Sequence, residues 1–130
     1  TKAHAARNGT SQHTPENFVH HITDVMQAWQ RAEIQGDETY ASFEGRVAEM
    51  LTLAARPGRR VLCVTSGGVI GMMARHLLDL DIARMSHLLV PIRNCSIHRI
   101  MVLPDVQILA GFNATPHLDG PDRIHARTEY

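Results

Sequence analysis

The sequence predicts a mixed α/β domain, and two observations lead to this prediction. Residues 60–70 form a run of β-formers that ends in a serine and two glycines, and a helical apolar pattern follows at once. This order is typical of a buried parallel strand that passes through a tight turn into a helix. Helical periodicity before the run and two further β-rich runs after it favour layers of helices against a sheet.

Two helices are expected before the strand. Thr14 suits the N-cap of the first helix, with Pro15 at its first position and Gly36 at its end. Ser42 suits the N-cap of the second helix, which Pro57 would end. Apolar side chains recur at helical spacing in both; they are Phe18, Ile22, Val25 and Trp29 in the first, and Phe43, Val47, Met50, Leu51 and Ala54 in the second.

The strand is expected over Val61–Thr65, and the helix after it is apolar on more than one side, so it is expected to be well buried. The methionine pair in that helix is interpreted as core filling. Asp81 suits the N-cap of a further short helix that ends near Leu88.

The last regular elements predicted are two strands over 96–103 and 106–112, which Pro104 and Asp105 connect as a hairpin. The predicted organisation is one domain, with a loop over residues 1–14, a core over 15–118 and a polar tail over 119–130.

Composition excludes several classes of function. Thirteen basic residues balance thirteen acidic ones, so the long-range field that attracts nucleic acid is missing. No apolar run reaches the roughly 20 residues of a membrane span. Cys63 and Cys95 are interpreted as buried free thiols of a reducing compartment, which favours the cytoplasm. The nine histidines show no metal-binding spacing, so neither a metal nor another cofactor is expected.

The turn between the strand and its helix is the candidate binding site. Ser66 offers a hydroxyl, and Gly67 and Gly68 offer backbone amides at the positive end of a helix dipole, where an anion such as phosphate binds readily. The dipole contributes only about 0.3–1 kcal/mol when exposed and up to about 2 kcal/mol when partly buried. A simpler interpretation is also open: the glycines serve a positive φ or close packing in an ordinary turn.

Several short stretches, in this order and spacing, resemble the C-terminal half of the histidine phosphatase superfamily, also called the phosphoglycerate-mutase-like family. The similarity covers roughly 75 residues, and no single motif in it would suffice. The matching stretches are Ser42–Phe43 with Arg46–Val47, Val61–Ile70, Asn94–Ile97, Phe112–Asn113 and His117–Leu118.

This resemblance implies a three-layer α/β/α sandwich and phosphoryl transfer to and from a phosphohistidine. In the family, two arginines and a second histidine surround the phosphate, and an acidic residue donates a proton. Ser66 stands where the second histidine usually stands, so the resemblance implies a catalytic position there. Asn94 and His117 are candidates for lining the pocket; alternatively, Asn94 holds a loop end by backbone hydrogen bonds and His117 is an exposed turn residue.

One departure from the family pattern concerns the nucleophile. The family carries it in an Arg-His-Gly at the end of a first strand, and this chain has no such tripeptide; its only Arg-His pair is Arg75–His76, followed by Leu77. We therefore expect that one or more N-terminal strands are missing from this chain and that an intact parent supplies the histidine. The 130-residue chain alone is expected to turn over weakly or not at all. The substrate class implied is a small phosphorylated molecule, and hydrolysis is favoured over mutase chemistry.

Two other functions are weighed against the phosphatase. One is a non-catalytic module that binds a phosphorylated ligand or a partner chain through the same turn. The other is a serine hydrolase, because Ser66, Asp105 and His117 follow the chain order of α/β-hydrolases; Val64, however, occupies the position where the nucleophile elbow requires glycine. An unpaired strand would also leave an edge on which a second copy pairs, so a homo-oligomer is a further expectation.

Overall fold

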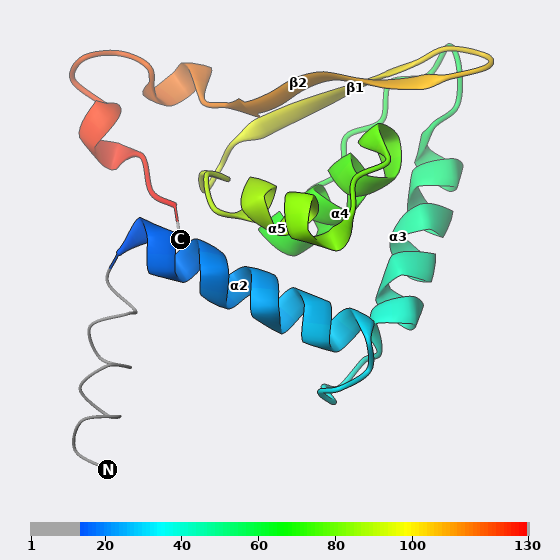
Figure 1. Ribbon diagram of the computed structural model, residues 1–130. Helices are drawn as coiled ribbons and strands as arrows, with labels where there is room; N and C mark the ends of the chain where they lie inside the picture. The colour runs from blue at the N-terminus through cyan, green and yellow to red at the C-terminus, as the bar shows by residue number, and fades with distance from the viewer. Residues whose placement is uncertain (1–13, 130) are drawn as a thin grey trace.

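The computed structural model describes residues 14–129, and Figure 1 shows their path. Apart from Thr14, the loop predicted over residues 1–14 lies outside the described residues. The described residues form four helices, two strands and two short 3₁₀ turns: α2 (Pro15–Gln30), α3 (Tyr40–Ala54), α4 (Gly67–Leu78), α5 (Ile82–Leu89), β1 (Ile97–Val102), β2 (Gln107–Ala114), η1 (Pro116–Leu118) and η2 (Ile124–Ala126). The mixed α/β class is confirmed.

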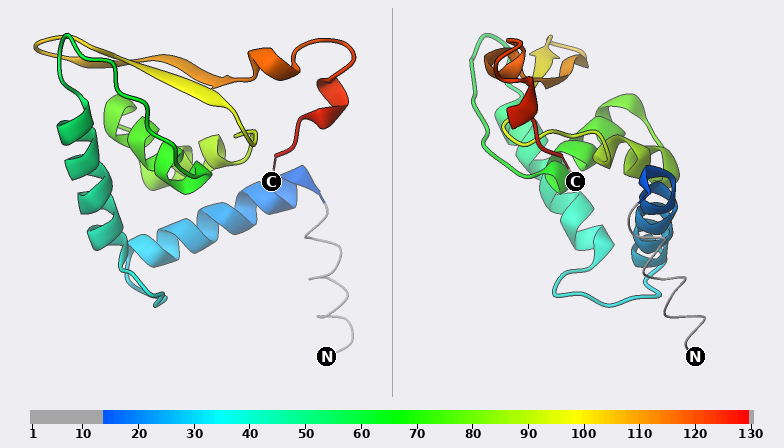
Figure 2. Two further views of the ribbon diagram at one scale, coloured as in Figure 1. Left: turned by 180° about the vertical axis from the view of Figure 1, so that it is seen from behind. Right: turned by 90° about the vertical axis from the view of Figure 1, so that its left-hand side faces the viewer.

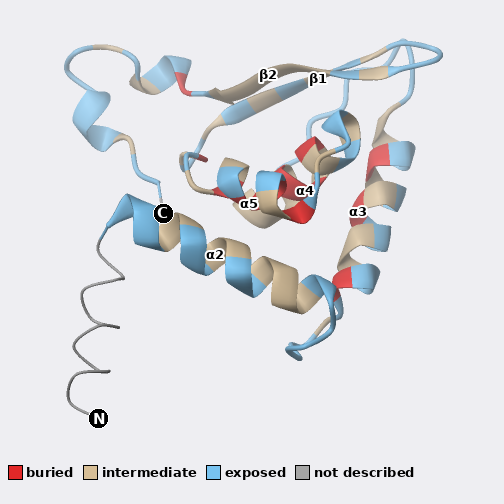
Figure 3. Cartoon of the chain, in the orientation of Figure 1, coloured by how far each residue is buried: buried red, intermediate tan, exposed pale blue. Residues whose placement is uncertain are grey.

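The helices lie beneath one face of the hairpin that β1 and β2 form (Figures 1 and 2). Helix α4 contacts α3, α5 and β2, and α2 contacts both α3 and α5. Figure 3 shows that the buried residues gather where these helices meet, mainly on α3, α4 and α5. Helix α4 is therefore the central element of the described fold.

The core is built around α4 and α5. Its largest fully buried side chains include Met72 of α4 and Met85 of α5, so the interpretation of Met72 as core filling is confirmed. Gly71 lets these two helices approach closely, because a Cβ on Gly71 would lie 2.4 Å from Leu89 Cδ2. The other buried apolar residues of this cluster are Tyr40, Val47, Ile82, Leu89 and Ile92.

Helix α2 joins this core by its half-buried face and contributes no buried residue of its own. Ile22, Met26 and Trp29 pack against the cluster. The Thr23 Oγ1 and Ser86 Oγ atoms lie 2.7 Å apart and form a hydrogen bond between α2 and the fully buried serine of α5. At the other end of α2, Trp29 Nε1 donates to the Glu38 carbonyl at 3.0 Å. Partial burial and these polar bonds position the helix.

Most helix boundaries agree with the capping signals in the sequence. Thr14 and Asp81 cap α2 and α5, as predicted, because each side chain accepts a hydrogen bond from an amide of the first turn. The prediction that Ser42 caps the second helix was wrong: Thr39 is the cap, and its side chain accepts from the Ser42 amide. Helix α2 also ends before Gly36, at a turn in which Ala32 has a φ of 57°.

The hairpin is antiparallel and irregular. Its register changes on both sides of Arg99, and at each change β2 advances one residue more than β1, so β2 carries the bulge. Asn113, with a φ of 59°, ties the bulge to the preceding loop: its side chain accepts from the Arg93 amide (2.8 Å) and donates to the Pro91 carbonyl (2.6 Å). These bonds hold β2 against the chain that leaves α5.

The strand predicted over Val61–Thr65 does not form. This segment has no regular structure and is exposed throughout, and Leu62 and Val64 keep 90% and 93% of their surface accessible. A strand needs a hydrogen-bonded neighbour, and the part of the chain that the structure describes supplies none beside it. The prediction of buried thiols was wrong for the same segment, since Cys63 is exposed; Cys95, in a turn with a φ of 60°, is exposed too.

Candidate functional site

Ser66 lies where the exposed segment enters α4, as the sequence predicts for the helix start. Its backbone is extended (φ −104°, ψ 166°) and its carbonyl accepts from the Ile70 amide at 3.1 Å. Its side chain makes no capping hydrogen bond and is exposed. The hydroxyl and the first amides of α4 are therefore available to an anion, beside the positive end of a 12-residue helix.

Gly68 has no structural requirement within the described chain. A Cβ there would meet nothing within 4 Å. Neither Gly67 nor Gly68 has a positive φ, since Gly58 is the glycine with that backbone conformation among the described residues. The simpler interpretation, a glycine demanded by turn geometry or packing, is thus not supported at Gly68. A small residue there does leave the first turn of α4 open to close approach.

Helix α4 is held firmly at its other end. Arg75 is paired with Glu44 of α3, and its guanidinium carbon lies 5.9 Å from the centre of the Tyr40 ring. Burial raises the pKa of the Tyr40 hydroxyl above its usual value. These contacts fix the orientation of α4, and hence the direction in which its first amides point.

The candidate pocket residues Asn94 and His117 make hydrogen bonds to the C-terminal part of the described chain. Asn94 is exposed, and both its backbone amide and its side-chain amide donate to Thr128, each at 2.8 Å. His117 is exposed in η1, where its carbonyl accepts from Arg123 at 3.1 Å. In residues 14–129, no hydrogen bond or ion pair joins either of them to Ser66. Their roles in lining a pocket stay predictions.

The other constellations considered from the sequence are also dispersed. Asp105 lies in the hairpin turn and His117 in η1, and no described hydrogen bond joins them to Ser66. His76 occupies the last turn of α4. At 1.5 Å of rise per residue, it lies about 15 Å along the helix from Ser66. Over residues 14–129, no group of three or more His, Cys, Asp and Glu residues is placed to hold a metal ion.

A charged cluster at the start of α3 was not foreseen from the sequence. Arg46 donates to both carboxylate oxygens of Glu38 at 2.7 Å and 2.6 Å, and Ser42 Oγ donates to the same carboxylate at 3.0 Å. The Arg46 hydrogen bond lowers the pKa of Glu38, and the same pair raises the pKa of Arg46. The sequence signal that could have revealed this cluster is the spacing of four residues between Glu38, Ser42 and Arg46.

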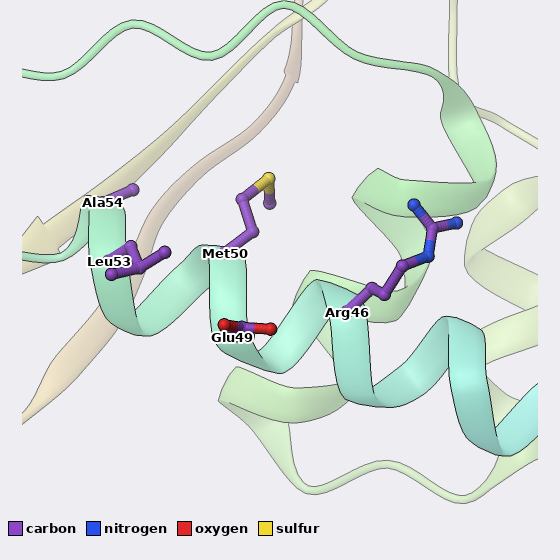
Figure 4. A pocket seen from close by; sticks show the side chains of 5 residues that line it. All are labelled: Arg46, Glu49, Met50, Leu53 and Ala54. Carbon is purple, nitrogen blue, oxygen red and sulfur yellow. The ribbon is translucent and has the colours of Figure 1, made fainter.

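Two hollows lie on the described surface, and neither is lined by Ser66, Gly67 or Gly68. The first has a volume of about 500 Å³ and lies on α3; Figure 4 shows Arg46 and Met50 projecting from the same side of that helix. The second, about 440 Å³, lies at the hairpin turn and is lined in part by His76, Asp105 and Gln107. Neither of these two hollows is therefore the candidate anion site.

His98 is a half-buried histidine in the hairpin. Its Nδ1 accepts from the Asn113 amide at 3.1 Å, its Nε2 lies 2.8 Å from Ser96 Oγ, and its ring packs edge-on against Phe112 with centroids 4.9 Å apart. Burial lowers its pKa. The neutral ring is thus part of the hairpin structure, because Nδ1 accepts a bond only when unprotonated.

Comparison with known proteins agrees with the resemblance found in the sequence. The model of the histidine phosphatase superfamily (branch 1) matches residues 6–115. Neither the curated proteins nor the solved structures give a significant match. No described helix combines the length and apolarity that crossing a membrane requires. Since the family match extends over most of the 130 residues, the chain belongs to the histidine phosphatase superfamily.

Proposed function

We propose that this chain supplies the Ser66–Gly67–Gly68 corner of the phosphate pocket in a phosphomonoester hydrolase of the histidine phosphatase type. The observation that carries the proposal is an uncapped, exposed serine at the start of α4, in a chain of this family. A hydroxyl without a capping bond is free to donate to a ligand, and the first amides of the helix point the same way.

In the proposed site, these groups bind and orient the phosphoryl group but do not attack it. Phosphoryl transfer depends on positioning and on stabilising charge on the equatorial oxygens. Ser66 donates one hydrogen bond to an oxygen, and the amides of Gly67 and Gly68 donate others. The proposal assigns the attacking imidazole to a segment outside the described residues, because His76 lies at the opposite end of α4. The substrate is a small phosphorylated molecule.

A second candidate is a module that binds a phosphorylated ligand without catalysis. One observation favours it for the chain on its own: within residues 14–129, no histidine or arginine side chain forms a hydrogen bond with Ser66. An anion would then meet a hydroxyl and amides alone. Such a site can retain a phosphate, but it has neither a nitrogen nucleophile nor a full positive charge.

Binding of inorganic phosphate, followed through the NMR amide signals of Gly67 and Gly68, tests the corner itself. We expect both signals to shift on titration, and Ser66→Ala to weaken binding about tenfold, because a hydrogen bond to a charged group contributes about 1.5–3 kcal/mol. Thr14→Ala, which removes the capping hydroxyl of α2 instead, is the matched control and is expected to bind phosphate normally. Equal binding by the Ser66→Ala variant would refute the assignment.

Turnover of para-nitrophenyl phosphate separates the two candidates. We expect the 130-residue chain to bind phosphate with little or no turnover, and a longer parent chain to hydrolyse the ester. A longer parent that binds phosphate but does not hydrolyse any phosphomonoester would favour the binding module. Loss of turnover in the Ser66→Ala variant of an active parent, with the Thr14→Ala variant unaffected, would support the phosphatase.

A further inference from the structure

Residues 116–129 form a strap that leaves the end of β2 and folds back to the loop after α5. The strap contains the short turns η1 and η2, and none of its residues is buried. Figures 1 and 3 show it as a largely exposed arch beyond the hairpin. Because little apolar surface of the strap is covered, polar bonds must hold it in place.

The strap is bonded to itself at both of its turns. Arg127 Nη2 donates to Asp119 Oδ1 at 2.5 Å, and Thr115 Oγ1, just before the strap, donates to the same oxygen at 3.1 Å. Arg123 Nη1 donates to the His117 carbonyl at 3.1 Å. Because these bonds connect the two ends of the strap to each other, it is expected to move as one unit.

One residue outside the strap, Asn94, holds its far end. The Asn94 backbone amide donates to the Thr128 carbonyl, and Asn94 Nδ2 donates to Thr128 Oγ1, each at 2.8 Å. At the near end, Arg93 Nη1 lies 3.4 Å from Thr115 Oγ1, which is a long hydrogen bond. Among residues 14–129, no ion pair joins the strap to another part of the chain. The two bonds at Asn94 are therefore the main attachment that the described residues provide.

Arg127 opposes this attachment. Its Nε atom is buried and has no hydrogen-bond partner among residues 14–129. A buried donor without a partner has lost its bonds to water, and the cost is larger for a charged group than for a neutral one. In the closed strap, two neutral hydrogen bonds at Asn94 are thus offset by one unpartnered charged donor, so closure is expected to be only weakly favoured.

We propose that the strap opens as a unit about Thr115 and releases Asn94 while the helical core stays folded. Thr115 suits a hinge because it is 2% exposed, and hence anchored, directly between β2 and η1. Opening returns Arg127 Nε to water and frees the two donors of Asn94. The loop that carries Asn94 does not depend on the strap, since the Arg93 amide donates to Asn113 Oδ1 of β2 at 2.8 Å.

Native-state hydrogen exchange of the full chain tests the proposal, because the Asn94 amide reports closure and the Met72 amide, inside α4, reports the core. We expect the Asn94 amide to exchange at least about a hundredfold faster than the Met72 amide. Low concentrations of urea are expected to change the Asn94 rate little, because opening the strap exposes little apolar surface, and to raise the Met72 rate. Equal rates with equal urea dependence would overturn the proposal, because the strap would then open only when the core unfolds.

The Thr128→Val variant removes the hydroxyl that accepts from Asn94 Nδ2 and keeps the shape of the side chain. We expect it to speed exchange of the Asn94 amide about three- to tenfold, as the loss of one neutral hydrogen bond predicts, and to leave the Met72 rate unchanged. Thr52→Val is the matched control, since the Thr52 hydroxyl donates to the Ala48 carbonyl within α3, and it is expected to leave both rates unchanged. An Asn94 rate that Thr128→Val does not alter would overturn the assigned contact.

An Asn94 amide that exchanges as fast as an unstructured amide would also overturn the proposal, because the strap would then not close. Both measurements are made without phosphate. Failure of the strap would therefore leave the proposed phosphate site untouched, and failure of the phosphate site would leave the strap intact.

Discussion

Two segments of the chain are rich in β-formers, but only one of them forms a paired strand in the structure. Residues of β1 (Ile97–Val102) pair with β2, and Phe112 of the hairpin packs on the helical core. Val61–Thr65 has similar composition but neither a paired neighbour nor a covered face. The difference shows that a β-forming run becomes a strand only where the chain brings a second edge to it, because the ladder, not the side chains alone, satisfies the backbone.

The same contrast recurs within the first two turns of α4. Gly71 faces α5 and has no room for a side chain, whereas Gly68 faces open space. Packing explains Gly71, and no packing contact of the described chain explains Gly68. The buried middle of α4, with Gly71, Met72 and Ala74, therefore carries stability, and its first turn carries the proposed site.

The largest loss of stability is expected from truncating a buried side chain of the core. Met85→Ala removes a side chain with no exposed surface and is expected to lower the free energy of unfolding by about 2–5 kcal/mol. Leu62→Ala, in the exposed segment, is expected to change it by less than about 0.5 kcal/mol. Urea denaturation of both variants measures this, under conditions where the chain is monomeric. A Leu62→Ala variant as unstable as Met85→Ala would show that the segment is covered in solution.

An intermediate change in stability is expected when each of the two glycines of α4 is replaced by alanine. Gly71→Ala places a methyl group 2.4 Å from Leu89 Cδ2 and is expected to destabilise the fold by about 1–3 kcal/mol, since the buried leucine must move. Gly68→Ala meets no neighbour and is expected to be neutral or slightly stabilising, because alanine favours a helix. Thermal unfolding compares the two, and phosphate titration of the folded Gly68→Ala variant sharpens the comparison. Equal destabilisation at both positions would contradict it.

The smallest change in the free energy of unfolding is expected from protonation of His98 in the hairpin. Burial lowers its pKa from the usual 6.5, so as the pH falls the unfolded chain binds the proton before the folded chain does. The free energy of unfolding therefore keeps its full value above about pH 6.5 and decreases as the pH falls through the lowered pKa.

Hydrogen exchange of the Asn113 amide follows this effect locally, because that amide donates to His98 Nδ1. We expect its protection to decline below pH 6.5 in the original chain and to lose this pH dependence in His98→Gln. Protection that increases on acidification would show that the ring is protonated in the folded hairpin, and the lowered pKa would be wrong.

The start of a helix could be predicted from the sequence where the capping side chain bonds to an amide of the first turn and to no other group. Thr14 and Asp81 are such caps, and both were found. Ser42 misled because its hydroxyl donates to Glu38, whose carboxylate Arg46 also holds, so its role depends on the charged groups around it rather than on its own type. The hairpin was predicted because its turn is local, while the fate of Val61–Thr65 depends on a partner that no local pattern specifies.

For the candidate site, the position of Ser66 could be predicted and its surroundings could not. The change from β-formers to a helical pattern locates the first turn of α4. The hydrogen bonds of Asn94 and His117 to Thr128 and Arg123 depend on the fold. Contacts between residues far apart in sequence carry no periodic signal.

The hydroxyl bond between Thr23 and Ser86 has a consequence for the order in which the molecule comes apart. Helix α2 gains little from burial, so this bond, the bond from Trp29 Nε1 to the Glu38 carbonyl and three partly buried side chains oppose its release. Detachment of this helix costs less than global unfolding, because the Met72–Met85 contact region belongs to other elements. Among the four α-helices of the described chain, we therefore expect α2 to be the first cooperative unit to open and the last to close.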